Sequence, residues 1–141
     1  MTDVTGCKNG IVALLRAAAP NGVTVLVNVD PQSVDGVKVP EFACLVLGGI
    51  DFEENELLGT NTLQMELWTW DLYIGTGPGA QEETGMDRCS TLLDIFKAAL
   101  VSQEPDSYST PLERRRVEFV DWRDNGGPLY RQEWFHMRSE G

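Results

Sequence analysis

The sequence predicts an α+β fold in which two helices pack on one face of a mostly antiparallel sheet. Two segments, 8–19 and 86–100, have the apolar spacing of amphipathic helices. Several shorter segments are apolar or alternating, as strands are, and a Gly-rich turn at 124–127 joins the last two as a hairpin. These elements form a two-layer sandwich, so the second sheet face is left without a helix over it.

Composition is that of a globular chain, with 42% hydrophobic and 23% charged residues, and 141 residues fit a single domain, 1–141. Acidic residues outnumber basic ones by 22 to 11, and the net charge of -11 argues against a general nucleic-acid-binding surface. The cluster Arg114–Arg116 is expected to lie in a strand with local acidic partners. The three cysteines form no CxxC pair, which favours a reducing compartment. We expect a cytoplasmic chain without a signal peptide or a membrane span.

The first half of the chain predicts one helix and two strands before an acidic loop. The helix at 8–19 is stopped by Pro20, and a strand with alternating valines follows at 23–29. Pro, Gly, Ser and Asp indicate a loop at 30–40. The apolar run 42–47 predicts a strand buried on both faces, and we expect it to end at Gly48–Gly49. An acidic loop is predicted from 51 to 62.

In the second half a long strand, 63–74, precedes a Gly-rich connection at 75–79 and the second helix, capped by Thr84 or Gly85. The apolar face of that helix is predicted from six residues: Met86, Cys89, Leu92, Leu93, Phe96 and Leu100. A loop at 105–111 and the hairpin of 115–122 with 129–137 complete the chain.

The long strand is apolar on both of its faces. Its first apolar residues, Leu63, Met65 and Leu67, are predicted to face the helices, and from Trp68 onward the other face is apolar. The change of parity between Leu67 and Trp68 predicts a bulge or a twist in mid-strand. Four tryptophans are predicted candidates for the open sheet face: Trp68, Trp70, Trp122 and Trp134. We predict that an oligomer interface is formed by four residues: Trp68, Trp70, Leu72 and Trp134.

No residues form a recognisable catalytic, cofactor-binding or metal-binding constellation, so we predict that the chain is not an enzyme and needs no cofactor. His136 is the only histidine, and a structural role is expected for it. The acidic segment that includes Asp51 and Glu54 lacks the spacing of a calcium loop, although an acidic metal site remains a weaker alternative. The glycines at 75–79 lack the ending of a P-loop.

The order of elements resembles a known family. It comprises an N-terminal helix with Ile11, Leu14 and Leu15, the strand Ala43–Leu47 ending at Gly48, an acidic loop, the long strand Leu63–Ile74, a Gly-rich connection, the helix Leu92–Leu100, and a hairpin with Trp134 and Phe135. This layout is similar to that of the tail terminator, or tail completion, proteins of Mu-like phages and prophages.

The resemblance implies a structural protein that forms a ring, usually of six copies, on the end of the tail tube. Its implied partners are other copies of itself, the tail tube protein and the head–tail connector protein. DNA would pass through the ring without being specifically bound, which suits the negative charge. The implied location is the host bacterial cytoplasm during assembly and then the virion tail. The alternative is a small acidic cytoplasmic module that binds a basic protein and does not self-assemble.

Overall fold

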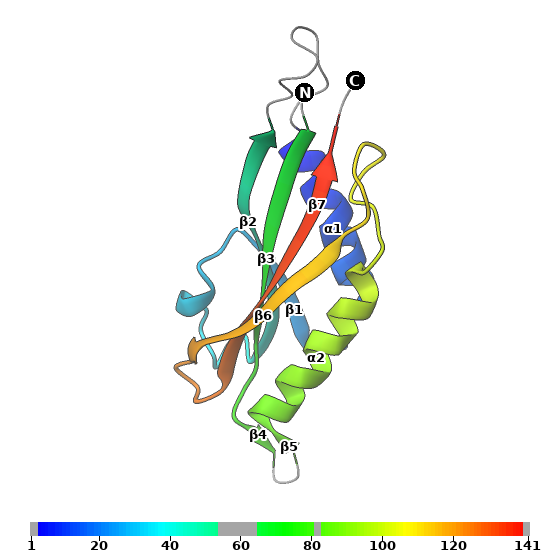
Figure 1. Cartoon of the computed structure of the whole chain (residues 1–141). Coiled ribbons are helices and arrows are strands. Elements are labelled where there is room, and N and C mark those ends of the chain that lie inside the picture. Colours follow the sequence, from blue (N-terminus) through cyan, green and yellow to red (C-terminus); the bar gives the residue numbers. More distant parts are fainter. Residues whose placement is uncertain (1–2, 54–64, 81–82, 140–141) are drawn as a thin grey trace, which may run out of the picture.

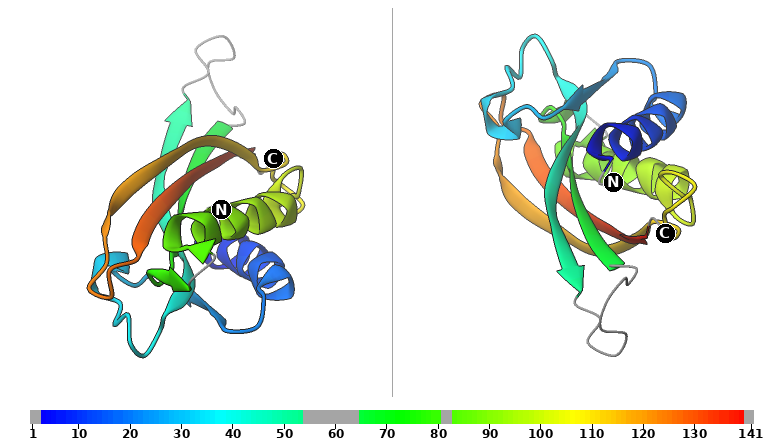
Figure 2. Two further views of the ribbon diagram at one scale, coloured as in Figure 1. Left: turned by 90° about the horizontal axis from the view of Figure 1, so that it is seen from below. Right: turned by 90° about the horizontal axis from the view of Figure 1, so that it is seen from above.

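The computed structural model describes residues 3–53, 65–80 and 83–139, and it shows a curved five-stranded sheet with both helices on one side (Figures 1 and 2). The strand order is β1-β2-β3-β7-β6, and only the β1–β2 pair is parallel. This confirms the predicted α+β class with its mostly antiparallel sheet.

The main elements are α1 (Val4–Ala18), β1 (Val23–Val27), β2 (Glu41–Glu53), β3 (Met65–Gly75), α2 (Gly85–Leu100), β6 (Glu113–Trp122) and β7 (Pro128–Arg138). A short helical turn, η1 (Pro31–Ser33), and two small strands, β4 (Gly79–Ala80) and β5 (Glu83–Thr84), complete the set.

Both helices lie where the sequence predicts them, with different ends. The first helix begins at Val4 and not at residue 8, because the Asp3 carboxylate caps it by accepting a hydrogen bond from the Gly6 amide at 2.8 Å. In α2 the predicted apolar face is buried except for Met86, whose side chain is 45% exposed. Gly10 brings α1 against the loop after α2, since a Cβ there would lie 2.1 Å from the Pro105 carbonyl oxygen.

The core between the sheet and the helices is built on the even-numbered residues of β3 and β7. Trp68, Trp70 and Trp134 are at most 2% exposed and pack among the buried residues of α1 and α2. Each buried indole N–H has an acceptor, as burial in an apolar environment demands: Glu66 for Trp68, His136 for Trp70 and Gln132 for Trp134.

This arrangement corrects the predicted orientation of the long strand. Met65 and Leu67 lie on the face away from the helices, and Leu63 is outside the described residues. The strand alternates regularly along its length and pairs with β7 without a bulge. Thr69 and Asp71 explain the outcome, because they are the polar residues of the outer face and they share the parity of Met65 and Leu67.

The second strand, β2, is longer than predicted and carries the bulge itself. It continues through Gly48–Gly49 to Glu53, and its register against β3 shifts between Leu47 and Gly49. Asp51–Glu53 therefore belong to a strand, whereas the rest of the predicted acidic loop, from residue 54, lies outside the described residues.

One end of the helix-free face has a cover of its own. The segment 28–40 between β1 and β2 packs Val34 against Phe42, Cys44 and Leu129, and these four residues form a second, smaller core. Arg123 fastens this segment by donating hydrogen bonds to the carbonyls of residues 39, 40 and 76 at 2.7–2.9 Å. This segment covers only one end of the helix-free face.

The four tryptophans provide a direct test of this core. Replacing Trp68 or Trp134 by Ala should lower the free energy of unfolding by about 3–5 kcal/mol, because each leaves a large cavity. The matched change Trp122→Ala, at a side chain that is 57% exposed, should alter it by about 0.5 kcal/mol or less. Urea unfolding followed by circular dichroism measures all three. Equal losses for Trp122 and Trp68 would contradict the assignment of faces.

Candidate functional site

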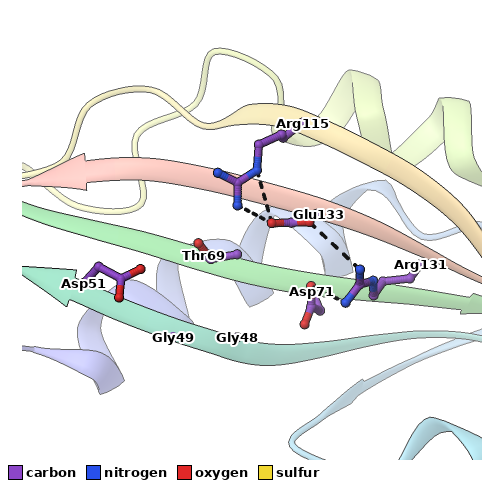
Figure 3. A pocket seen from close by; sticks show the side chains of 8 residues that line it. All are labelled: Gly48, Gly49, Asp51, Thr69, Asp71, Arg115, Arg131 and Glu133. Carbon is purple, nitrogen blue, oxygen red and sulfur yellow. Dashed lines mark hydrogen bonds and ion pairs between the residues drawn. The ribbon is translucent and has the colours of Figure 1, made fainter.

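A polar hollow of about 340 Å³ lies on the helix-free face of the sheet (Figure 3). We call it the sheet-face hollow, and eight residues line it: Gly48, Gly49, Asp51, Thr69, Asp71, Arg115, Arg131 and Glu133. The two glycines stand at the bulge of β2. A Cβ at Gly48 would lie 3.1 Å from the Thr69 carbonyl oxygen, whereas one at Gly49 would meet nothing within 4 Å. The missing side chains of β2 therefore open the hollow beside β3.

Ion pairs connect the charged groups around the hollow. Arg131 lies 3.6 Å from Asp71, 2.5 Å from Glu118 and 4.0 Å from Glu133. Arg115 also pairs with Glu133, and Arg116 pairs with Glu118 at 2.9 Å. The predicted local acidic partners of the arginine cluster are thus confirmed for Arg115 and Arg116.

Burial and hydrogen bonding shift the pKa values of two carboxyls in the hollow in opposite directions. Burial raises the pKa of the Asp71 carboxyl above its usual 3.8, although the positive charge of Arg131 opposes this effect. A hydrogen bond from Arg115 lowers the pKa of Glu133. Four of the five lining charges pair with one another, whereas Asp51 has no ion pair with a described residue. The lining residues include no thiol or imidazole. This arrangement suits a polar contact surface better than a reaction centre.

A second polar cluster is buried at the end of β7, around Arg138. This side chain is 1% exposed, and its Nε donates a hydrogen bond to Asp106 Oδ2 at 2.9 Å. Its Nη1 lies 3.6 Å from Glu66 Oε1, and its guanidinium carbon lies 5.7 Å from the ring centre of Trp68. Asp106 also accepts a hydrogen bond from Ser109 Oγ at 2.6 Å. The cluster therefore ties the loop after α2 to the sheet, and its role is structural.

The sequence pattern does not single out Arg123, but it contains one signal for Arg138. Arg138 continues the alternation of Gln132, Trp134 and His136 along β7, so its parity places it on the buried face, where it requires an acidic partner. Nothing in the local sequence pairs Arg123 with the carbonyls of the 28–40 segment, because that contact spans more than 80 residues.

His136 and the cysteines lie in the interior. His136 Nε2 accepts a hydrogen bond from Trp70 Nε1 at 3.0 Å, and burial lowers the pKa of the imidazole to about 4. The imidazole is therefore neutral at pH 7 and belongs to the core, in line with the predicted structural role. All three cysteines are buried and unpaired, and burial raises the pKa of Cys7 to about 11 and that of Cys89 to about 12. Thiols with such pKa values are poor nucleophiles at neutral pH.

None of the four residues predicted to form the oligomer interface is at the surface. Trp68, Trp70, Leu72 and Trp134 are all at most 2% exposed, and they face the helices of their own chain. Their predicted position on an open face is wrong, because the aromatic parity of β3 and β7 is the one that the helices cover. Any interface of the folded subunit must therefore be formed by other side chains.

Exposed apolar side chains gather instead where β6 passes the start of α2. We define the β6 corner as Met86, Val117, Phe119 and Trp122, each 40–57% exposed. Phe119 joins Trp122 and the partly buried Tyr130 through edge-to-face contacts of 5.2 and 5.6 Å between ring centres. A shallow hollow of about 270 Å³ lies among six residues there: Pro78, Gly85, Met86, Trp122, Gly126 and Pro128.

Among the described residues, no three His, Cys, Asp or Glu side chains are grouped so that they could hold a metal ion. Neither helix in the described part of the chain is long and apolar enough to cross a membrane.

No protein-family model and no curated protein matches this chain. A solved structure that does match is the sheath/tube terminator of an extracellular contractile injection system, PVC, in its extended state. The match covers 100% of this chain with a TM-score of 0.50 and 10% sequence identity. The two folds are similar. This chain spans 58% of the length of that terminator. At 10% sequence identity, the likeness concerns the fold alone.

Two carboxylates with opposite pKa shifts make a paired test of the polar clusters. Burial alone would raise the pKa of Asp106, but hydrogen bonds from Ser109 and Arg138 hold it below 3.8. The charged form therefore stabilises the fold above that pH, and Asp106→Asn should lower the free energy of unfolding at pH 7. The deficit should shrink as the pH falls below 3.8 through the lowered pKa.

Asp71→Asn should behave in the opposite way, because the raised pKa makes the charged form of Asp71 unfavourable in the folded state. The variant should match the wild type below pH 3.8 and become relatively more stable as the pH rises through the raised pKa. Urea unfolding measured between about pH 3 and pH 7 compares both variants with the wild type. A loss at neutral pH for Asp71→Asn would contradict the stated cause of its shift.

Proposed function

We propose that this chain is a structural protein of a phage-like contractile tail, and that it assembles as a ring on the end of the tail tube. The observation that carries the proposal is the similarity in fold to a sheath/tube terminator, which extends over the whole chain. The order of elements in the sequence supports it independently, because it resembles the tail terminator proteins of Mu-like phages and prophages.

The chemistry of the surface is compatible with this role. All the charged groups of the sheet-face hollow except Asp51 are paired with one another, as in a contact surface, and the thiols and the imidazole are enclosed in the core. We therefore propose a non-enzymatic role without a cofactor, in which specificity comes from the shape and charge of the subunit.

The finer features of the proposal follow the Mu-like family. They are a ring of six copies, contacts with the tail tube protein and the head–tail connector protein, and passage of DNA without specific binding. The net charge of -11 supports the last feature, since a ring of acidic subunits repels the phosphate backbone. Assembly would take place in the host bacterial cytoplasm and end in the virion tail.

The test uses tail tubes grown from the tube protein encoded in the same genome. Addition of the purified, gold-labelled chain should place label at tube ends and stop further growth when more tube protein is supplied, because a ring on the end removes the template for the next subunit. Electron microscopy measures both the position of the label and the length of the tubes.

An unrelated acidic protein of similar size, labelled in the same way, controls for adhesion through charge alone. Label along the sides of the tubes, or continued growth of capped tubes, would contradict the proposal. A chain that ignores tubes but binds a basic protein as a monomer would favour the alternative of a small acidic binding module.

A further inference from the structure

The first strand, β1, forms one edge of the five-stranded sheet. In the described part of the chain it pairs with β2 alone, and the opposite edge of the sheet is β6. Four of the five residues of β1 are Val or Leu, yet none of the five is fully buried. The valines pack against the main core and Leu26 packs against the smaller one. β1 therefore carries both cores to the limit of the sheet and leaves them incompletely covered there.

Backbone groups on the free side of β1 have no hydrogen-bond partner among the described residues. The Asn28 amide donates to a carbonyl of β2 at 2.9 Å, so the even-numbered residues bond to β2. Because successive residues of a strand point their N–H and C=O groups to opposite sides, those of Val25 and Val27 point away from β2. The Val23 amide, on the same side, is satisfied by the Pro20 carbonyl at 3.1 Å. Val25 and Val27 thus each offer one donor and one acceptor to a further strand.

The two edges of the sheet differ in their protection against strand addition. The register of β6 against β7 shifts twice, and six of its ten residues are charged, which discourages a further strand. β1 pairs with β2 in regular register and contains no charge and no proline. Its five residues are an ordinary length for a strand, and Asn28, with a φ of +55°, ends it. β1 is therefore the edge that can accept a strand from another chain.

This strand is complementary to a second copy of itself. In an antiparallel pair with its two-fold axis at Leu26, Val25 of each copy lies opposite Val27 of the other. The free N–H and C=O groups of both valines are then all paired. The valines of both copies lie on the helix-covered side, and the two Leu26 side chains meet on the other side. One register thus matches the backbone groups and the apolar side chains together.

The distribution of charge favours the same occupant. The chain has no charged residue from Ala17 to Val29, which is the longest uncharged run in the sequence. Two copies that each carry a net charge of -11 can therefore join these strands without placing like charges opposite one another.

We infer that β1 is a self-association surface, at which two copies of this chain join their sheets by antiparallel β1–β1 pairing. The contact uses the same patch on both copies and closes at two. It is separate from the head-to-tail contacts of the proposed ring, and it goes beyond the terminator role.

The first test measures association of the full chain by sedimentation velocity. The wild type should form a reversible dimer with a Kd of about 10–100 μM, because a pair of five-residue strands is smaller than a standard interface. Its affinity should rise with salt concentration, since screening reduces the repulsion between the acidic copies. A chain that stays monomeric at about 500 μM, or a dimer that salt dissociates, would overturn the inference.

Two variants test the strand itself. Val25→Pro should weaken the dimer by about tenfold or more, because it removes a central donor from each copy. The lost N–H faces away from β2, so pairing within the subunit is kept. Thr24→Glu, at an exposed position of β1, should also weaken the dimer by bringing charge into the contact. Val117→Glu, at a side chain of β6 that is 40% exposed, makes the same change in net charge and should dimerise as the wild type does.

Circular dichroism checks that each variant is folded. A folded Val25→Pro or Thr24→Glu chain that dimerises as tightly as the wild type would count against β1 as the contact.

Disulfide formation tests the register. Both cysteine variants carry Cys44→Ala, because Cys44 lies opposite Leu26 on β2 and would compete for the new thiol. Leu26→Cys should give a cross-linked dimer with oxidised glutathione, since the two Cα atoms at the axis are about 4.5 Å apart. Thr24→Cys is the matched control, and its two copies lie four positions apart, about 13 Å or more. No cross-link in either variant, or equal cross-linking of both, would overturn this pairing.

The outcome for the proposed function is separate. A Val25→Pro chain that is monomeric in solution and still caps tubes would support both the β1 contact and the terminator role. A wild-type chain that dimerises through β1 but never binds tube ends would overturn the terminator role and leave the β1 contact intact.

Discussion

Three tryptophan side chains fill the space between the sheet and the two helices, and their burial decides which face of each central strand points outward. Trp68 and Trp70 on β3 and Trp134 on β7 have the same parity, so both strands are fixed once any of them is buried. The polar hollow then has to open on the opposite face, where Asp71 and Arg131 are the residues of the other parity. The position of the charged surface is therefore a consequence of the aromatic core.

Burial of so many indoles requires polar partners inside the same core. Glu66, His136 and Gln132 accept the three indole N–H groups, and Glu66 in turn lies beside the buried Arg138. Because each of these groups would be costly to bury alone, the cluster at the end of β7 and the core tryptophans stabilise one another. Arg138 also holds the loop after α2 through Asp106, so the polar network extends the core beyond the sheet.

The sequence predicts the elements well because their signals are local. Apolar spacing locates both helices, and the Gly-rich turn at 124–127 locates the hairpin. The sequence does not predict the orientation of β3, because both faces of this strand carry large apolar residues and the position of the helices depends on the rest of the fold. The polar residues Thr69 and Asp71 have the same parity as Met65 and Leu67, and they indicate that this parity faces away from the helices. The β6 corner could not be predicted, since its exposure depends on where α2 ends its cover of the sheet.

The same geometry changes where an assembly contact has to be sought. An aromatic strand buried under its own helices supplies stability but no surface, so any contact between copies has to use residues that the two layers leave open. The β6–β7 hairpin leaves such residues open, because Phe119 and Trp122 are 44% and 57% exposed.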